Sequence, residues 1–452
     1  MTEPDFSQRK FHFIAIGGAG MSGLALVCHR LGARVSGSDR TESSYLARLR
    51  EAGLEPRIGH DADAVPDDAE VVVSTAIADD NPELARARER GQAVLHRGQL
   101  LAELCAQGRL IAVAGTHGKT TTTGMLVHAL QEMDADPAFF IGGELPGAGP
   151  DGAAANAGWG EESSERRKAR NKVGPPGKGG KWIVAEADES DGSFLELRPE
   201  VAVVTNVELD HHARWSSRAE LTEAFASFAA HAKGLAVAAG EELRLPSTAP
   251  AIARFDESVP GPAELDLRVP GRHNVLNARA ALAALELAGF DTEIAAKALS
   301  GFPGMVRRQE LKGEVAGAVV YDDYAHHPTE VRATLEAMRE LEPKRIVAVF
   351  QPHLYSRTKA LAQDFGAALA AADEVGVLDV YPAREEPVGP LAGVTGLLVA
   401  RAAADRAGGK PVLWLRDRVT AAAVLKPRLR DGDLLITIGA GDIHLLAEEL
   451  LA

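Results

Sequence analysis

The stretch AVAGTHGKTTTTG, residues 112–124, has the residue types of a phosphate-binding loop. It follows an apolar run, and Gly118, Lys119 and Thr120 would open the helix that comes next. The N–H groups at such a helix start can hold phosphate oxygens, a lysine can neutralise the β- and γ-phosphates, and a threonine hydroxyl can bind magnesium. The strict pattern begins with a glycine where this chain has Val113, so a plain glycine turn stays open at this point.

Acidic side chains follow two further apolar runs, at places where strands are expected to end. The first run is followed by Glu186, Asp188, Glu189 and Asp191, and the second by Asn206, Glu208, Asp210, His211 and His212. The carboxyl ends of parallel strands lie at one edge of a sheet, and magnesium takes oxygen ligands. We therefore expect one or two of these carboxylates beside the phosphate loop. Most of the other acids are expected to be solvated loop residues, and a helix-capping role stays open for the histidines.

A second glycine-rich turn lies near the N-terminus. The segment GGAGMSG has the spacing Gly18-x-Gly20-x-x-Gly23 between an apolar run and a helical pattern, and Asp39 ends the next apolar run. This spacing is typical of dinucleotide sites, in which an acid binds the ribose. The glycines themselves require only that a diphosphate approaches the backbone closely. NAD, a nucleotide-sugar diphosphate and a turn without ligand therefore all stay open.

Polar residues also gather after two runs in the last third of the chain. They are Asp322, Asp323, Tyr324, His326 and His327 in YDDYAHHPTE, and His353, Tyr355 and Arg357 in FQPHLYSRTKAL. Arg357 could hold a carboxylate with its planar fork of donors, and His326 could orient a substrate or move a proton. Taken singly, each residue is equally open to a capping or packing role.

The elements that would position these residues alternate along the whole chain. Short β-branched runs and helical patterns follow one another, which predicts an α/β fold with doubly wound, mostly parallel sheets. A length of 452 residues suggests three domains at about 150 residues each. We place them at 1–108, 109–303 and 304–452. The polar, glycine-rich segment 161–181 breaks the alternation and is expected to be a mobile, solvated loop.

Composition narrows the class of protein. A formal net charge of −15 argues against nucleic-acid partners and anionic membrane surfaces. No stretch approaches the roughly 20 apolar residues of a membrane helix, and the first residues lack the apolar core of a signal peptide. The two cysteines, Cys28 and Cys105, provide no disulfide framework or cysteine metal cluster. These features predict a cytoplasmic enzyme or binding protein.

Six motifs, in order along the chain, make the sequence resemble the Mur ligase family, the ATP-dependent amide-bond-forming enzymes of peptidoglycan and cell-wall synthesis. The motifs are GGAGMSGLA, GTHGKTTT, EADESDGSF, GRHNVLNA, YDDYAHHPTE and QPHLYSRT. The family's own phosphate loop has the shortened form Gly-Thr-x-Gly-Lys-Thr, so Val113 is no departure from it. The resemblance implies three domains: a Rossmann-like domain for a UDP-sugar, a central P-loop ATPase-like domain with a mostly parallel sheet, and a Rossmann-like domain for an amino acid.

The resemblance also implies roles for residues at the matching motif positions. The UDP-sugar is expected at Gly18, Ala19, Gly20, Met21, Ser22, Asp39 and Ser74. ATP is expected at Gly115, Thr116, His117, Gly118, Lys119, Thr120, Thr121, His273, Asn274, Asn277, Arg308 and Asp323. Magnesium is expected at Thr120, Glu186 and His211, and the amino acid at Tyr324, His326 and Arg357. The residues expected to be catalytic are Lys119, Glu186, His211, His326 and Arg357.

The implied reaction uses ATP and Mg²⁺ to join L-alanine to the lactyl carboxylate of UDP-N-acetylmuramate through an acyl phosphate. The implied protein is a monomer or weak homodimer without nucleic-acid or membrane partners. One alternative is a related ligase that attaches a recycled tripeptide to the same UDP-sugar, and another is a non-catalytic nucleotide or UDP-sugar sensor. An NAD-dependent dehydrogenase would leave the ATP motifs unexplained. Leu354 and Gln309 depart from the family pattern, which commonly has an arginine and an aromatic residue at these positions.

Overall fold

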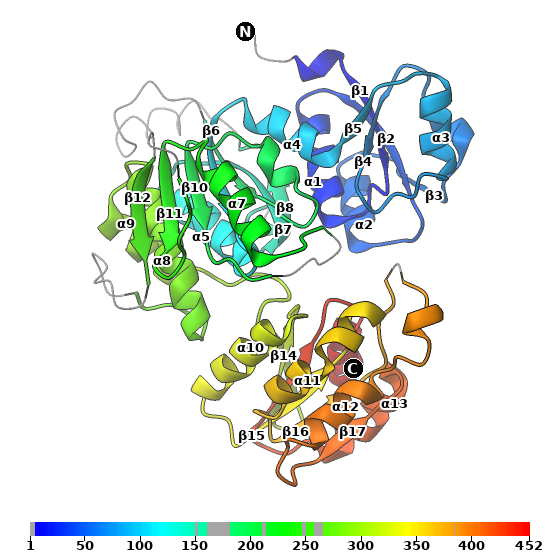
Figure 1. The fold of residues 1–452 in the computed structure, drawn as a ribbon, viewed down its shortest axis with the longest axis vertical. Helices are drawn as coiled ribbons and strands as arrows, with labels where there is room; N and C mark the ends of the chain where they lie inside the picture. The colour runs from blue at the N-terminus through cyan, green and yellow to red at the C-terminus, as the bar shows by residue number, and fades with distance from the viewer. Residues whose placement is uncertain are drawn as a thin grey trace. The chain divides into compact units, whose positions relative to one another are not determined.

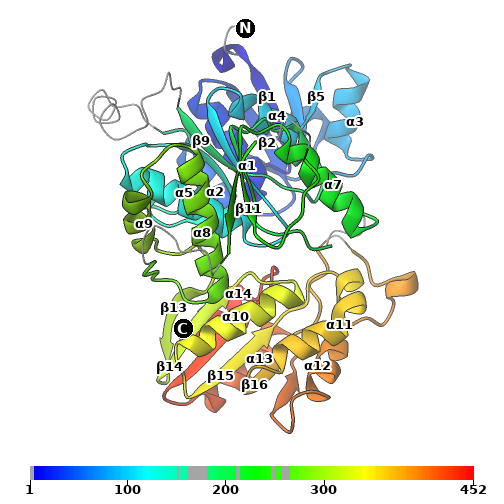
Figure 2. The same cartoon turned by 60° about the vertical axis from the view of Figure 1, so that its left-hand side comes forward.

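The computed structural model describes residues 5–149, 152–160, 181–209, 214–245, 250–256, 265–383 and 385–452. The described residues form three β-sheets flanked by helices (Figures 1 and 2). They divide into two compact units, residues 1–267 with 276–302 and residues 268–275 with 303–452. The first unit contains two of the sheets and the second unit contains the third. The predicted α/β class is confirmed, whereas the exact domain boundaries remain a prediction.

The first sheet has five strands in the order β3-β2-β1-β4-β5, all parallel. This is the strand order of Rossmann folds, whose ligands bind where the order reverses, beside the first strand. Its elements are η1 (Phe6–Gln8), β1 (Lys10–Ile14), α1 (Ala19–Arg30), β2 (Arg34–Asp39), α2 (Ser44–Glu51), β3 (Arg57–Ile58), η2 (Ala62–Ala64), β4 (Glu70–Val73), α3 (Pro82–Glu89), β5 (Val94–His96) and α4 (Arg97–Cys105). The Gly18 turn therefore lies at the reversal point.

The second sheet has seven strands in the order β12-β11-β10-β6-β9-β7-β8, and only the β7–β8 pair is antiparallel. Its central strands are continuous apolar runs because helices cover both faces of the sheet. Its strands are β6 (Arg109–Ala114), β7 (Ala138–Leu145), β8 (Ala155–Gly158), β9 (Trp182–Glu186), β10 (Val201–Val204), β11 (Gly234–Ala238) and β12 (Ala251–Phe255). The helices around it are α5 (Lys119–Glu132), η4 (Ser193–Glu196), α7 (Arg218–Ala229), α8 (Arg272–Leu287) and α9 (Thr292–Ser300).

The third sheet has six strands in the order β13-β14-β18-β15-β16-β17. Its strands are β13 (Glu310–Val315), β14 (Ala318–Asp323), β15 (Arg345–Phe350), β16 (Glu374–Val377), β17 (Val412–Trp414) and β18 (Asp433–Ile438). The helices are α10 (Pro328–Glu340), α11 (Tyr355–Leu369), η5 (Gly389–Leu391), α12 (Leu397–Ala404), α13 (Arg418–Leu425), η6 (Lys426–Arg428) and α14 (His444–Leu451).

The antiparallel hairpin β13–β14 was not predicted from the sequence. Its two turn residues, Ala316 and Gly317, have φ values of +53° and +76°. Two left-handed residues make the tight turn that matches the twist of a hairpin, but an alanine at the first of them is an uncommon choice. The sequence signal for this turn was therefore weak.

The aromatic side chain of Phe194 anchors the loop that follows β9. Its ring is 1% exposed and lies 5.3 Å and 5.4 Å from the rings of Phe225 and Phe228 on α7. The acidic residues of EADESD directly precede this anchor. Packing of Phe194 thus holds the acidic loop at the carboxyl edge of the second sheet.

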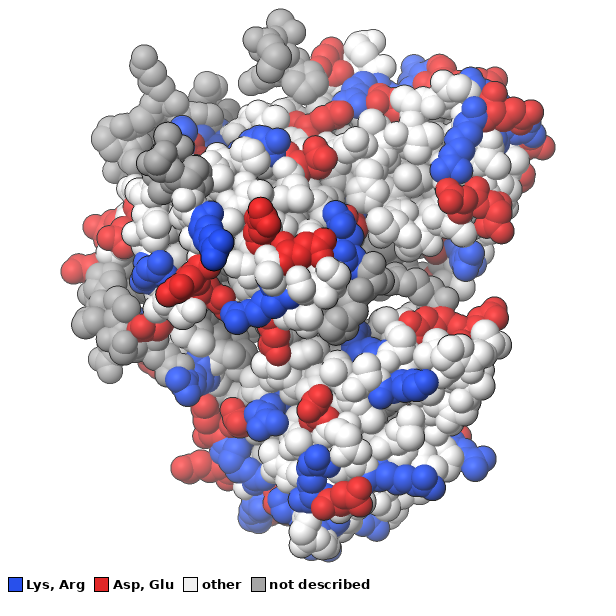
Figure 3. Space-filling model, in the orientation of Figure 1, with Lys and Arg blue, Asp and Glu red and all other residues white. Residues whose placement is uncertain are grey.

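On the face drawn in Figure 3, lysine and arginine side chains are interspersed with aspartate and glutamate. Among the described residues, no helix is long and apolar enough to cross a membrane.

Replacing Phe194 by alanine is expected to lower the free energy of unfolding by about 3–5 kcal/mol, because the change leaves a cavity in a closed aromatic core. Urea unfolding followed by circular dichroism measures the loss. Ile58→Ala is the control, since Ile58 is 47% exposed on the edge strand β3 and its truncation is expected to cost less than about 0.5 kcal/mol. Equal losses for the two variants would contradict the anchoring role.

Candidate active site

The phosphate loop joins β6 to α5, and its glycines have backbone angles that other residues avoid. Gly118 caps α5 with a φ of +81°, and Gly115 has a φ of +136°. A Cβ atom at Gly115 would lie 2.0 Å from Thr205 Oγ1, so no side chain fits there. Asn206 holds the loop from the end of β10, since its Oδ1 accepts the His117 N–H at 2.9 Å and its Nδ2 donates to the His117 carbonyl at 3.0 Å. A neighbouring strand therefore helps to set the shape of the loop.

Lys119 begins α5, and oxygen atoms surround its ammonium group. Nζ donates to the carbonyls of Gly115 and Thr116 at 2.6 Å and 3.2 Å, and it lies 2.8 Å from Glu189 Oε2. Burial lowers the pKa of Lys119, but Glu189 and two neighbouring carboxylates raise it by more, so the net shift is upward. Lys119 thus remains a cation in the loop that would receive phosphate groups.

Thr120 and Glu186, two of the predicted magnesium ligands, are in contact. The Thr120 hydroxyl donates to Glu186 Oε1 at 3.1 Å, and Glu186 Oε2 accepts the Gly142 N–H at 2.7 Å. A Cβ atom at Gly142, on β7, would lie 2.8 Å from Glu186 Oε1, so a glycine makes room for the carboxylate. His211, the third predicted ligand, lies outside the described residues.

The expectation that most acids after β9 are solvated is wrong for three of them. Asp188 and Asp191 accept hydrogen bonds from Arg97 Nη2 at 2.6 Å and 2.8 Å, and Glu189 pairs with Lys119. The side chains of Asp191 and Glu189 are only 3% and 1% exposed. Burial raises the pKa of Asp188, but Arg97 and Lys119 together lower it well below its usual range. The partner cations lie far away in the sequence, so the local pattern could not reveal them.

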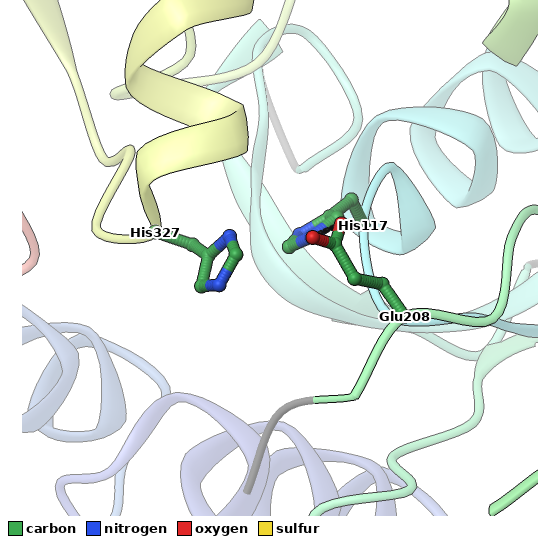
Figure 4. A group of neighbouring side chains, drawn as sticks. All are labelled: His117, Glu208 and His327. Atoms are coloured by element: carbon green, nitrogen blue, oxygen red, sulfur yellow. Dashed lines mark hydrogen bonds and ion pairs between the residues drawn. The ribbon is translucent and has the colours of Figure 1, made fainter. Parts of the chain in front are cut away.

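The loop after β10 is bound to the phosphate loop by two further residues (Figure 4). His117 Nε2 lies 3.0 Å from Glu208 Oε2, and Thr116 Oγ1 donates to the Glu208 carbonyl at 2.8 Å. The Glu208 N–H donates to Thr116 Oγ1 at 2.9 Å. His327 belongs to the second unit, where it caps α10 through its side chain.

The remaining predicted ATP residues of the first unit lie on α5 and α8. Thr121 is partly exposed in the first turn of α5, and Thr122 Oγ1 donates to Asn277 Oδ1 at 3.3 Å. A Cβ atom at Gly118 would lie 2.4 Å from the same Asn277 oxygen. Asn277 therefore lies against the phosphate loop, and its role in ATP binding stays a prediction.

The second glycine turn joins β1 to α1, and its predicted residues open that helix. Gly18 is the N-cap, and Ala19, Gly20, Met21 and Ser22 follow it. The two glycines are exposed, whereas the side chains of Met21 and Ser22 are buried inside the protein. Asn156 of β8 donates from Nδ2 to the Ala19 carbonyl at 2.6 Å. The second sheet thus helps to hold the glycine turn of the first.

Asp39 is the last residue of β2 and Ser74 follows β4, at the same edge of the first sheet as the glycine turn. Asp39 Oδ2 accepts the Gly17 N–H at 2.8 Å, and its Oδ1 accepts the Arg40 N–H at 2.7 Å. The Ser74 hydroxyl accepts the Ala76 N–H at 3.4 Å. Asp39 therefore supports the glycine turn directly, while Ser74 binds its own loop.

A cavity of about 290 Å³ lies in the first unit between the two loops. Its lining includes Gly20, Arg97, Gly142, Asn156, Glu186 and Asp188. The cavity begins at the glycine turn and ends at the carboxylate that contacts Thr120. A ligand seated on the glycine turn can therefore extend to the edge of the phosphate loop without leaving one cavity.

In the second unit, the predicted ATP residues gather around Gln309. Its N–H donates to Asp323 Oδ2 at 2.9 Å, and its side-chain Oε1 accepts from Asn274 Nδ2 at 3.1 Å. Its Nε2 lies 3.1 Å from His273 Nε2. Burial raises the pKa of Asp323 to about 6 and lowers the pKa of His273 to about 4. Gln309, which departs from the family pattern, is thus the residue that joins this group.

Left-handed backbone on both sides of Arg308 fixes its place. Arg307 and Gln309 have φ values of +59° and +52°. Arg307 is anchored by a hydrogen bond from Nε to Asp322 Oδ2 at 3.0 Å. The guanidinium carbons of Arg307 and Arg308 lie 5.0 Å and 5.2 Å from the centre of the Tyr324 ring.

Two of the three residues predicted to receive the amino acid, Tyr324 and His326, belong to a row of rings. The ring centres of Tyr324 and His326 are 5.6 Å apart, and His353 lies 6.3 Å beyond His326. His353 stacks on Tyr381 at 5.8 Å. Burial and the nearby charge of Arg357, in the first turn of α11, lower the pKa of His326 to about 4 although Glu330 opposes the shift. His326 is therefore neutral near pH 7.

Sequence reasoning missed three residues that contribute to these groups. Arg97 and Asn156 line the cavity, and Tyr381 ends the row of rings. None of them lies in a recognisable motif, and each reaches its group only because another strand or helix end lies beside it. Only knowledge of the strand order could have found them.

Comparison with known proteins gives matches over nearly the whole chain. Residues 10–109 match the model described as "Mur ligase family, catalytic domain", residues 113–249 the "Mur ligase middle domain", and residues 307–441 the "Mur ligase, glutamate ligase domain". The UDP-N-acetylmuramate–L-alanine ligase of Kineococcus radiotolerans is 46% identical, over 98% of this chain and 95% of the relative. That of Streptomyces coelicolor is 44% identical over 97% and 96%.

Two solved structures are similar over 98% of this chain and 98% of their own. The UDP-N-acetylmuramate-alanine ligase of Thermotoga maritima has a TM-score of 0.80 at 28% identity. A murein peptide ligase of Psychrobacter arcticus has a TM-score of 0.67 at 25% identity.

Replacing Gly118 by alanine is expected to weaken ATP binding by roughly 10- to 100-fold, because the new Cβ would displace the loop from Asn277. Gly147→Ala is the matched control, since Gly147 has a similar φ of +77° but open space around it. Both variants carry the cost of a left-handed alanine, about 1–2 kcal/mol, and only the first adds the steric clash. Titration with a fluorescent ATP analogue and thermal unfolding compare them. Equal affinities would contradict the role of the contact.

His326 is expected to make the second unit less stable as the pH falls from about 6.5 to about 4. In this range the unfolded chain binds a proton at His326 that the folded chain does not bind, so unfolding becomes more favourable as the pH falls. His326→Gln is expected to remove about 1–3 kcal/mol of this dependence, as measured by urea unfolding at pH 7 and pH 4.5. His29→Gln, on α1, serves as the control. An unchanged pH dependence in His326→Gln would be the contrary result.

Proposed function

The chain belongs to the Mur ligase family, and we propose that it joins L-alanine to the lactyl carboxylate of UDP-N-acetylmuramate while ATP is converted to ADP and phosphate. The product would be a precursor of peptidoglycan. The observation that carries this proposal is the cavity that runs from the glycine turn to Glu186 beside the phosphate loop. A sugar nucleotide held at the first end would present its carboxylate near the γ-phosphate of ATP at the second.

Alanine is the amine that the comparisons favour. The curated relatives that share most of the chain are alanine ligases, and the alanine-ligase structure has the higher TM-score of the two. The murein peptide ligase remains the second candidate because its structure is also similar over the whole chain. A tripeptide would need more room than alanine beside the row of rings in the second unit.

The first step would bring two anions together. A carboxylate oxygen of the sugar nucleotide attacks the γ-phosphorus of ATP, the bond from that phosphorus to the β–γ bridging oxygen breaks, and an acyl phosphate and ADP result. Lys119 would offset the negative charge on the phosphoryl oxygens, because its ammonium is already held at the loop by carbonyl groups. Asn206 and the glycines keep the loop in shape for this contact.

The second step would be attack of the neutral amine of alanine on the acyl carbon, after which phosphate leaves. Arg357 would hold the carboxylate of alanine. His326 Nδ1 lies 3.1 Å from the Tyr324 carbonyl, which can only accept, so this nitrogen carries the proton. Nε2 is then left with a free lone pair, and it could accept a proton from the attacking amine.

Magnesium fits the residues beside the phosphate loop. The Thr120 hydroxyl and the Glu186 carboxylate are adjacent oxygen donors, which is the donor type that Mg²⁺ prefers. The bound ion would supply positive charge to the phosphate oxygens. We propose Thr120 and Glu186 as its ligands, and His211 as a ligand of a second magnesium ion.

We also propose that the enzyme works in the cytoplasm on small molecules, as a monomer or weak homodimer. A non-catalytic sensor would bind ATP or the UDP-sugar without turnover. The paired Lys119 and the adjacent Thr120 and Glu186 favour catalysis, because a sensor has no need to hold a cation beside a reacting phosphate.

Phosphate release is the measurement that tests the reaction. With ATP, Mg²⁺ and UDP-N-acetylmuramate, release is expected on addition of L-alanine and not on addition of the L-Ala-D-Glu-diamino-acid tripeptide. Lys119→Ala is expected to lower kcat by roughly 1,000-fold or more while UDP binding stays nearly unchanged. Lys233→Ala is the control, because the Lys233 side chain is 81% exposed on the same unit.

Turnover with the tripeptide alone would assign the chain to the second candidate function. Binding of UDP-N-acetylmuramate without turnover with either amine would support the sensor. Equal loss of turnover and UDP binding in Lys119→Ala would mean that the two loops do not have the separate roles proposed for them.

A further inference from the structure

Arg97 is the one lysine or arginine among the described residues that line the cavity of the first unit. A guanidinium group has five N–H donors. Nη2 donates to Asp188 and Asp191, at 2.6 Å and 2.8 Å, whereas Nε and Nη1 make no hydrogen bond with any described residue. Arg97 thus has donors left over in a cavity that a ligand can enter.

One of the unused donor groups, Nη1, faces the glycine turn. A Cβ atom at Gly20 would lie 3.4 Å from Arg97 Nη1, so the guanidinium lies against the first turn of α1. The two aspartates occupy Nη2, on the side of the loop after β9. The N–H groups of Arg97 that border the glycine turn are therefore the ones available to a ligand anion.

Arg97 keeps its positive charge in the folded protein. Burial lowers its pKa, but Asp188 and Asp191 raise it by more, so the group stays protonated. The same aspartates limit its rotation, because each bond to Nη2 would have to break before the side chain could turn away. Arg97 is thereby prepared to bind an anion at small further loss of side-chain entropy.

We propose that Arg97 binds the diphosphate of the sugar nucleotide through the N–H groups of Nη1, while Asp188 and Asp191 hold the guanidinium in position. The inference rests on the proposed UDP-sugar site at the glycine turn. A carboxylate is a less suitable ligand for these N–H groups, because the lactyl group must extend toward Glu186 at the far end of the cavity. Since Asp188 follows Glu186 by two residues, Arg97 also ties the diphosphate site to the acidic loop.

Calorimetric titration of the full chain tests this role. Arg97→Gln keeps amide donors but removes the charge, and it is expected to weaken binding of UDP and of UDP-N-acetylglucosamine by roughly 10- to 100-fold. Uridine, which has no phosphate, is expected to bind both proteins equally in saturation-transfer NMR. Arg97→Lys keeps the charge without the fork and is expected to lose less affinity than Arg97→Gln.

Arg48→Gln is the matched control. Arg48 also joins the first sheet's helices to the second sheet, through a 2.5 Å ion pair with Glu144, but it does not line the cavity. Arg48→Gln is expected to leave the affinity for UDP within about twofold of that of the unaltered chain. Thermal unfolding of all three variants separates loss of fold from loss of binding.

Three outcomes would overturn the inference. An unchanged UDP affinity in Arg97→Gln would remove Arg97 from the site. A loss of affinity in Arg97→Gln that is confined to UDP-N-acetylmuramate would assign Arg97 to the lactyl carboxylate. If uridine binding were weakened as much as UDP binding, the role of Arg97 would be structural. If the unaltered chain bound none of the UDP ligands, the proposed function itself would fail, which is a different result.

Discussion

The ion pair between Lys119 and Glu189 joins the phosphate loop to the acidic loop, and the chemistry of the first unit depends on it. Glu189 is buried and the Lys119 side chain is only 12% exposed, so each needs its partner; removal of one member of a buried pair costs about 3–5 kcal/mol. The Trp215 indole N–H donates to the Glu189 carbonyl at 3.0 Å and holds the acidic side of the pair. Glu189 thereby compensates the positive charge of Lys119 and holds its ammonium group at the phosphate loop.

Carboxylates outnumber cations around this pair. Glu186, Asp188, Glu189 and Asp191 surround only Arg97 and Lys119 within the described part of the first unit. The excess negative charge would repel ATP and a carboxylate substrate, so the site is suited to a nucleotide that arrives with divalent cations. The same excess explains why Arg97 and Lys119 both remain protonated. Acidic residues thus hold the two cations in place.

The second unit combines strained backbone with buried carboxylates. Arg307 and Gln309 are left-handed on either side of Arg308, and Leu354 begins α11 with a φ of +68°. Such conformations cost about 1–3 kcal/mol each and persist where the surroundings hold them. Here Asp322 holds Arg307, the Asp323 carboxylate accepts the Gln309 N–H, and the Leu354 N–H donates to the Tyr381 carbonyl. Each strained turn positions an arginine. Arg308 lies between Arg307 and Gln309, and Arg357, which we propose binds the substrate carboxylate, lies one turn after Leu354 on α11.

The sequence by itself determined the α/β class and the motif order, and it placed a glycine turn between a strand and a helix at Gly118, because apolar periodicity and glycine turns are local properties. Gly118 and Lys119 could be recognised from a few neighbours. The partners of Lys119 and Arg97 lie 70 and 91 residues away, and only the tertiary structure decided them. The physical reason is the strand order: β6 lies between β9 and β10, which are not its neighbours in the chain, so their carboxyl ends bring distant loops into contact.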